Sequence, residues 1–300
     1  MLTWSKYFQN PVFMELTRKY LIPEELCPTI LAHAGVGENT SVLDVASGTG
    51  YFSRLLKKHE PSARVTGLEY DGTFVEFARD KAREEQLDIT FVQGDALALP
   101  FEDETFDAVT SHTFLTSAAD PRKALQEMIR VCRRGGVVSS ITTMSALPSA
   151  FHGGFYRKEC SWAQPLADLS RKMNKMLGQI NPISNYVNDL PLAKLPHLFA
   201  MSGLKEIGAY PIGKLFSLSN ALIPYEERME YLDQMIEADR LKLEAYLELE
   251  GVTELFSRED AERYLELLDE KRAYYRSHPD ENQIWEWNGG ANVQVFGKKL

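Results

Sequence analysis

The sequence predicts an α/β fold built on a mostly parallel sheet flanked by helices. Short apolar and β-branched runs alternate with helical patterns along the first half of the chain. This alternation is typical of parallel strands joined by right-handed crossovers. A small-residue turn also follows the first run directly. The predicted strands lie near 41–46, 64–69, 89–93, 106–111 and 136–142.

The turn after the first strand is the most informative segment of the chain. The strand brings in Asp44, the small residues 46–50 follow, and an apolar helix begins near Tyr51. A strand, a glycine loop and a helix in this order present backbone N–H groups at the positive end of a helix. This suits a nucleotide-like ligand that carries a carboxylate or phosphate. Taken alone, the glycines also fit a simple tight turn, because glycine relieves φ restrictions anywhere.

Three later features narrow the choice of ligand. The second strand ends in Glu69, which is well placed to accept both hydroxyls of a ribose. The third strand closes with Gly94-Asp95-Ala96, and Phe106-Asp-Ala-Val leads into the fourth strand. In this order and at these separations, the features resemble the class I S-adenosylmethionine-dependent methyltransferases. The nearest resemblance is to the small-molecule branch typified by ubiquinone and menaquinone biosynthesis enzymes.

The resemblance is strong over 42–142 and weak over 204–210 and 293–298. It implies a Rossmann-like, seven-stranded, mostly parallel sheet, with helical insertions after strand 5 and between strands 6 and 7. It also implies S-adenosylmethionine as methyl donor and a small organic acceptor. The donor-binding positions it implies are Asp44, Ala46, Ser47, Gly48, Gly50, Glu69, Tyr70, Gly94, Asp95, Ala96 and Ser111.

Each part of the donor has its own expected partners. By the resemblance, the residues around the glycine loop hold the methionyl end and Glu69 binds the ribose. Tyr70 lies beside the adenine, and Asp95 accepts from the adenine amino group. Ser111 and His112 line the space near the transferable methyl. His112 is the candidate catalytic base, because histidine titrates near neutrality, and it serves equally as a neutral wall of the site.

A nicotinamide-dependent oxidoreductase is the main rival. Its ribose acid also lies about twenty residues beyond the glycines, so Glu69 satisfies both readings. Asp44 before the loop, and Ser53 where the third glycine would stand, favour the methyltransferase. The Gly-Asp-Ala element has no place in the dinucleotide fingerprint. Ala46 stands where the methyltransferase family often has glycine, which is a mild departure. A third hypothesis is a donor-binding protein without transfer activity.

The sequence predicts six segments. The first, 1–37, is a helical lid in which Trp4, Tyr7 and Tyr20 are candidates to cover the sulfonium through their aromatic faces. Simple core packing is the alternative for these rings. The S-adenosylmethionine-binding core follows at 38–145, an acceptor-side insertion at 146–190, continued core at 191–222, a helical hairpin at 223–282, and the final strand at 283–300.

The hairpin insertion rests on two apolar stripes at helical spacing, the first expected to stop at Gly251. Ser257 to Asp260 resembles a capping box at the start of the second helix. We expect the hairpin to cap the pocket or to mediate a homodimer. The range 224–281 holds 18 acidic residues against 8 basic ones, while the remaining chain is balanced.

Composition bounds the remaining possibilities. The net charge of −10 argues against a nucleic-acid substrate, which would be repelled. The three cysteines are too few and too scattered for a disulfide framework or a zinc site. We therefore expect no metal and a cytoplasmic location. The start of the chain shows no signal-peptide pattern. No apolar run approaches the ~18 residues of a membrane span.

Overall fold

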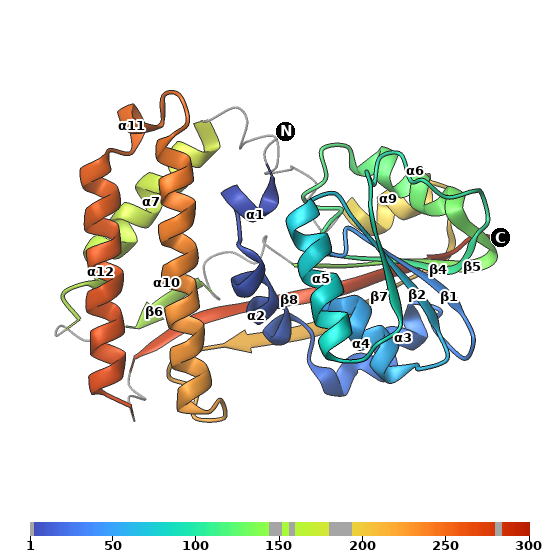
Figure 1. The fold of residues 1–300 in the computed structure, drawn as a ribbon, viewed down its shortest axis with the longest axis horizontal. Helices are drawn as coiled ribbons and strands as arrows, with labels where there is room; N and C mark the ends of the chain where they lie inside the picture. The colour runs from blue at the N-terminus through green and yellow to red at the C-terminus, as the bar shows by residue number, and fades with distance from the viewer. Residues whose placement is uncertain (1–2, 144–151, 156–159, 180–193, 280–283) are drawn as a thin grey trace. The chain divides into compact units, whose positions relative to one another are not determined.

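A computed structural model describes residues 3–143, 152–155, 160–179, 194–279 and 284–300. The chain divides into two compact units (Figure 1). We call the first the sheet unit; it comprises Thr17–Leu147, Asn188–Lys214 and Gly290–Leu300. We call the second the helical unit; it comprises Met1–Leu16, Pro148–Val187 and Leu215–Gly289. Each is described here by itself.

The sheet unit contains the predicted mostly parallel sheet. In this unit the strands run in the order β3-β2-β1-β4-β5-β8, and β7 also pairs with β8. The pairs β1–β2, β2–β3, β1–β4 and β4–β5 are parallel, and β5–β8 is antiparallel. The predicted fold is therefore confirmed. The strands are β1 (Ser41–Val45), β2 (Arg64–Glu69), β3 (Ile89–Gln93), β4 (Phe106–His112), β5 (Cys132–Thr143), β7 (Lys205–Phe216) and β8 (Trp285–Lys298).

Two helices in the sheet unit begin at a side-chain cap. The Asp71 side chain accepts the Thr73 N–H at the start of α5, and Asp120 accepts the Lys123 N–H at the start of α6. Pro121 occupies the first turn of α6, where its missing N–H costs nothing. The helices are α2 (Pro11–Leu21, which begins in the other unit), the 3-10 turn η1 (Glu24–Leu26), α3 (Cys27–His33), α4 (Tyr51–His59), α5 (Gly72–Glu84), α6 (Pro121–Val131) and α9 (Leu195–Met201).

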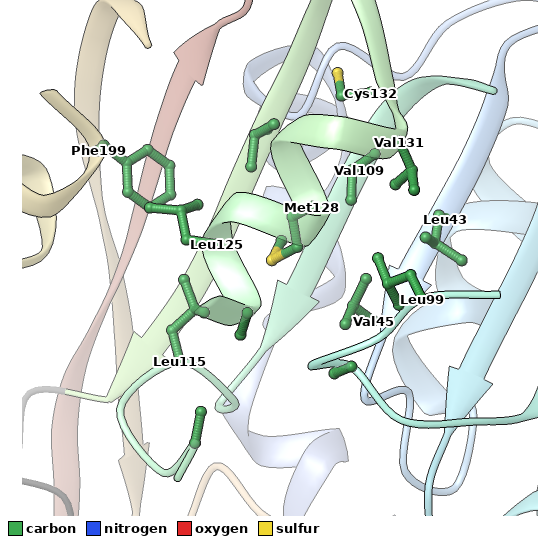
Figure 2. Packing of buried hydrophobic residues seen from close by; sticks show 14 of the residues in the cluster. Leu43, Val45, Leu99, Val109, Leu115, Leu125, Met128, Val131, Cys132 and Phe199 are labelled. Atoms are coloured by element: carbon green, nitrogen blue, oxygen red, sulfur yellow. The ribbon is translucent and has the colours of Figure 1, made fainter. Parts of the chain in front are cut away.

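Two apolar cores lie on opposite faces of the sheet, because successive strand side chains point to opposite sides. One core joins Val42 and Ala108 of the sheet to α3 and α4. The other joins Leu43, Val45 and Val109 to α6 and α9 (Figure 2). A smaller cluster packs α5 against Phe91 of β3. These cores hold the strand ends in fixed relation to one another.

A row of hydroxyl and amide side chains interrupts the apolar sheet between β4, β5 and β8. The Thr110 and Ser139 hydroxyls lie 3.2 Å apart, and Gln294 Nε2 donates to Ser139 at 3.3 Å. On the other face, the Ser111 hydroxyl donates to Ser140 at 3.0 Å. All five side chains are fully buried, so their polar atoms depend on one another for hydrogen bonds.

The helical unit contains both predicted insertions together with the first residues of the chain. Helix α12 packs against α7 and α10. The Ser257–Asp260 capping box is confirmed at the start of α12. A short strand, β6, pairs with the first half of β8. The elements are α1 (Trp4–Tyr7), β6 (His152–Phe155), α7 (Ala163–Gln179), α10 (Tyr225–Leu247), α11 (Val252–Leu255) and α12 (Arg258–Ser277).

One helix end differs from its prediction. The first hairpin helix, α10, was expected to continue to Gly251, but it ends at Leu247 with Glu248 as its C-cap. Gly251, at φ +78°, instead precedes the short helix α11. A left-handed glycine suits this sharp change of direction. Parts of the expected acceptor-side insertion, at 146–151, 156–159 and 180–190, lie outside the described residues.

No helix among the described residues combines the length and apolar character needed to span a membrane.

Candidate functional site

The candidate site lies in the sheet unit, where four parallel strands end. Asp44 of β1 is in register with Gly67 of β2 and with Thr110 of β4, and Glu69 is in register with Gln93 of β3. The carboxyl ends of β1 to β4 therefore meet at one edge of the sheet. Ligands of open α/β sheets bind outside this edge.

The loop after β1 turns sharply through three left-handed residues. Ala46 adopts φ +56°, Gly48 φ +55° and Gly50 φ +72°. Gly50 caps α4, and a Cβ placed there would come within 2.6 Å of the Phe91 ring. Glycine is thus required at Gly50 for both conformation and space. Ala46 takes the same conformation despite its Cβ, which costs about 1–2 kcal/mol.

Asp44 lies at the base of this loop and is only 1% exposed. Its Oδ2 accepts a hydrogen bond from Ser53 Oγ at 2.6 Å. Among the described residues, Oδ1 has no hydrogen-bond partner. Burial raises the pKa of Asp44 to about 7; the Ser53 hydroxyl opposes this rise and the nearby Glu69 adds to it. A cationic or N–H-bearing ligand group would stabilise the ionised form.

Glu69 joins the loop to the end of β2. Its Oε2 accepts the Gly48 N–H at 2.9 Å, and its Oε1 accepts the Asp71 N–H at 2.9 Å. Burial raises the pKa of Glu69, and these backbone donors partly offset the rise. A carboxylate offers about four acceptor sites. After both bonds, each oxygen retains capacity for one ligand hydroxyl.

The segment after β3 places an exposed carboxylate near this edge. Gly94 N–H donates to the Glu69 carbonyl at 2.9 Å, which ties the ends of β2 and β3 together. Asp95 is exposed, and its Oδ1 accepts the Leu97 N–H at 2.8 Å. Ala96 is buried at 8% exposure. The Tyr70 side chain is 46% exposed, so a face of its ring is open to a ligand.

The end of β4 is less accessible than the resemblance implied. Ser111 is fully buried, and its hydroxyl donates to Ser140 inside the sheet. His112 is 7% exposed, with its ring centroid 6.0 Å from that of Phe52. The Ser111 hydroxyl is thus engaged within the sheet, and the assignment of these two residues to the methyl-transfer region stays a prediction.

The loop fits an occupant rich in hydrogen-bonding groups. Buried side-chain oxygens of Asp44, Ser47 and Thr49 have no hydrogen-bond partner within the described part of the chain. Buried polar atoms are nearly always paired in folded proteins. All three belong to β1 or the loop that follows it. An aminocarboxylate or ribose bound there would supply donors and acceptors.

Several residues that support the site were not among the site residues expected from the sequence. Ser53 orients Asp44, and Gln93 Nε2 donates to the Tyr70 carbonyl at 3.0 Å. Arg54 Nη1 holds the Thr49 carbonyl at 2.8 Å. Ser53 offered one signal, since a hydroxyl residue stands there in place of a glycine. The Gln93 contact crosses 23 residues of sequence and leaves no local pattern.

The aromatic candidates for a lid lie in different places. Trp4 stacks on Phe8 in the helical unit, at 4.3 Å between ring centroids. Tyr7 belongs to α1 of that unit, whereas Tyr20 belongs to the part of α2 in the sheet unit. Their assignment to a lid stays a prediction. The sequence of the first insertion also offers His152, Tyr156 and Glu159 as weaker candidates for a catalytic group. Tyr156, Glu159 and the side chain of His152 lie outside the described residues.

Residues 43–140 match a protein-family model described as a methyltransferase domain. A demethylmenaquinone methyltransferase of Thermus thermophilus is 43% identical over 95 residues, which are 32% of this chain and 43% of that protein. The Lactococcus lactis demethylmenaquinone methyltransferase is 33% identical over 166 residues, 54% of this chain and 65% of that protein. The chain thus covers less than two thirds of either relative.

Solved structures share the fold at lower identity. A Bacillus halodurans protein is 17% identical with a TM-score of 0.52, covering 91% of this chain and 98% of that one. The cyclase SpnF is 16% identical with a TM-score of 0.50, covering 92% of this chain and 82% of that one. Because such a fold serves more than one reaction, the activity must be argued from the site.

Proposed function

We propose that this chain, whose residues 43–140 form a class I S-adenosylmethionine-dependent methyltransferase domain, transfers a methyl group to a small organic acceptor. The bond between methyl and sulfur breaks as the bond between methyl and acceptor forms. The electron pair stays on sulfur, which leaves as a neutral thioether. The donor is already activated, so the residues of the site contribute chiefly by orienting it and excluding water.

The arrangement of Asp44, Glu69 and Asp95 supports this proposal above all. Asp44 lies in β1, Glu69 ends β2 and Asp95 follows β3, and these three strands are adjacent in the sheet. Two are buried and one is exposed. A cationic amino acid joined to a ribose and an adenine presents an ammonium, a hydroxyl pair and an amino group, in that order. Each carboxylate matches one of these groups.

The proposed donor contacts follow from this match. Asp44, Ala46, Ser47, Gly48 and Gly50 hold the methionyl end. Asp44 Oδ1, which has no hydrogen-bond partner among the described residues, faces the ammonium. Glu69 accepts the ribose hydroxyls on its two remaining acceptor sites. Tyr70 covers the adenine face, and Asp95 accepts from the adenine amino group. Gly94 and Ala96 border the base through their backbone.

His112 is the proposed group on the acceptor side. A base is needed only if the acceptor must lose a proton during transfer. If His112 supplies it, His112→Gln lowers turnover and removes the acidic limb of the pH profile, while the donor dissociation constant is unchanged. A wall role predicts that the limb remains. His197→Gln, in α9, is the matched control.

The acceptor is a small organic molecule, and no nucleic acid takes part. Methylation of a quinone precursor is one possibility, supported by the names of the relatives. We assign acceptor recognition to the insertion at 146–190, and dimer formation to the helical hairpin at 223–282. A cytoplasmic location belongs to the same proposal, since the chain has only three cysteines, Cys27, Cys132 and Cys160, and they are widely separated in the sequence.

Calorimetric titration tests the donor site directly. The protein is expected to bind S-adenosylhomocysteine and to ignore NADH. The reverse result would establish the oxidoreductase alternative. A further outcome is that the protein binds the donor yet forms no S-adenosylhomocysteine from S-adenosylmethionine with hydroxyl, amine, thiol or quinol acceptors. That result would support the third hypothesis, a donor-binding protein without transfer activity. Product formation with one acceptor class identifies the substrate.

A further inference from the structure

A charged pair on α6 reaches the segment that follows β3. Residues 94–105, all of which the structure describes, form turns with no helix or strand among them. Their shape therefore depends on contacts with neighbouring elements. Glu127 Oε2 accepts the Leu99 N–H at 2.9 Å, and Arg130 Nη2 donates to the Leu99 carbonyl at 2.9 Å. Both backbone groups of Leu99 are held by α6.

The pair is itself firmly built. Arg130 donates to both oxygens of Glu127, from Nε at 3.0 Å and from Nη2 at 2.8 Å. Such two-point pairing fixes orientation as well as distance. Arg130 lowers the pKa of the Glu127 carboxyl, which keeps it an ionised acceptor. Arg130 Nη1 also donates to the Phe101 carbonyl at 2.7 Å.

The Leu99 side chain provides a second anchor. It is 4% exposed and belongs to the core that α6 shares with the sheet. Figure 2 shows Leu99 beside Leu43 and Val45 of β1. Glu127 is 8% exposed and lies at the margin of this core. Backbone and side chain of Leu99 are thus fixed together.

Asp95 begins the turn that leads to Leu99. Its backbone carbonyl accepts the Ala98 N–H at 3.0 Å, and its Oδ1 accepts the Leu97 N–H at 2.8 Å. Before the turn, Gly94 is bonded to the Glu69 carbonyl. The turn is therefore held at its front by β2 and at its back by α6. The exposed Asp95 carboxylate projects from a turn fixed at both ends.

We propose that Glu127 and Arg130 are positioning residues that set the base selectivity of the donor site by fixing the turn that carries Asp95. This inference rests on the proposed function, in which Asp95 reads the adenine amino group. Hydrogen bonding discriminates between bases only when the acceptor is held in place. The pair acts through the Leu99 peptide, without touching the donor.

Titration with two ligands tests the pair. S-adenosylhomocysteine and its inosine counterpart differ in the amino group that Asp95 would accept. In the unmutated protein the inosine ligand binds more weakly. In Glu127→Gln and Arg130→Lys, the ratio of the two dissociation constants is expected to fall by about tenfold. Asp95→Ala gives the ratio expected when the acceptor is absent. Arg122→Gln, an exposed change on α6, is expected to keep the ratio of the unmutated protein.

The readout separates positioning from stability alone. Variants that melt earlier but keep the unmutated ratio would overturn the proposal and leave the pair a structural tie. Faster hydrogen exchange at the Leu99 amide, together with a reduced ratio, supports it. Should Arg130→Lys fail to fold, the milder Glu127→Gln decides the question. If the unmutated protein binds no S-adenosylhomocysteine, the proposed function fails and this inference with it.

Discussion

The carboxylate of Glu69 accepts the backbone N–H of Gly48 at 2.9 Å, across 21 residues of sequence. A residue at the end of β2 thereby holds the loop that follows β1. The loop conformation is set by the protein itself, so little ordering is required when a ligand binds. Preorganisation of this kind favours affinity because fewer groups lose freedom on binding.

Glu69→Ala is expected to weaken binding of S-adenosylhomocysteine by about 1–3 kcal/mol, because the ribose hydroxyls lose their acceptor and the loop loses a tie. Calorimetric titration measures the change. Glu102→Gln, an exposed change in the same unit, serves as control. An unchanged dissociation constant for Glu69→Ala would remove Glu69 from the donor site.

The raised pKa of Asp44 predicts how stability depends on pH without ligand. The folded protein retains a proton on Asp44 up to about pH 7, whereas the ordinary value is 3.8. The contribution of Asp44 to folding stability is therefore complete below about pH 3.8 and is lost as the pH rises through about 7. Between pH 5 and 8, the unfolding free energy of Asp44→Asn should fall less than that of the unmutated protein, as denaturant titrations would reveal.

Donor affinity should change with pH in the opposite sense. A bound ammonium favours the ionised form of Asp44, so S-adenosylhomocysteine binds more tightly as the pH rises through about 7. Binding near neutrality then releases a proton. Titrations in buffers of different ionisation enthalpy count that proton. If Asp44→Asn releases the same number of protons on binding S-adenosylhomocysteine, another group is responsible for the release.

Ala46→Gly is expected to stabilise the protein. Ala46 adopts φ +56°, a conformation that glycine takes without strain. The gain is about 1 kcal/mol, after the greater flexibility of glycine in the unfolded chain is deducted. Thermal unfolding measures it. Ala32→Gly, an exposed change within α3, is the control and should destabilise.

Gly50→Ala is expected to have the opposite effect. Its new Cβ would come within 2.6 Å of the Phe91 ring, in a backbone at φ +72°. Strain and overpacking together cost about 2–4 kcal/mol. Denaturant unfolding tests this value, with Gly37→Ala as the comparison, where a Cβ meets nothing within 4 Å. Equal stability of the two variants would contradict the fixed position of Phe91.

Local patterns in the sequence were sufficient to predict the strands and the hairpin helices. The apolar runs that lead to Asp44, Glu69 and Asp95 predicted the strands of the sheet. The Ser257–Asp260 capping box predicted the start of α12. These features depend on residues close together in sequence. Such regularity also predicted the turn after β1 and the three candidate carboxylates, whose roles stay predictions.

Long-range contacts left no comparable signal. The Glu127–Arg130 pair looks like an ordinary helix ion pair in sequence, and only the fold brings it to Leu99. The left-handed Ala46 was equally hidden, because alanine usually avoids that conformation. The two insertions also gave no sign that they would gather with residues 1–16 in one unit.

The buried hydroxyls between β4 and β5 bear on how the sheet assembles. Thr110 faces Ser139, and Ser111 faces Ser140, only in the observed alignment. A slide of one position would leave one hydroxyl opposite another, set Ser111 against Ile141 or Thr110 against Val138, and exchange the two sides of a strand. Apolar strands alone tolerate near-miss alignments more readily. These four residues thus make misassembly of the central strands costly, and so protect the alignment on which the candidate site depends.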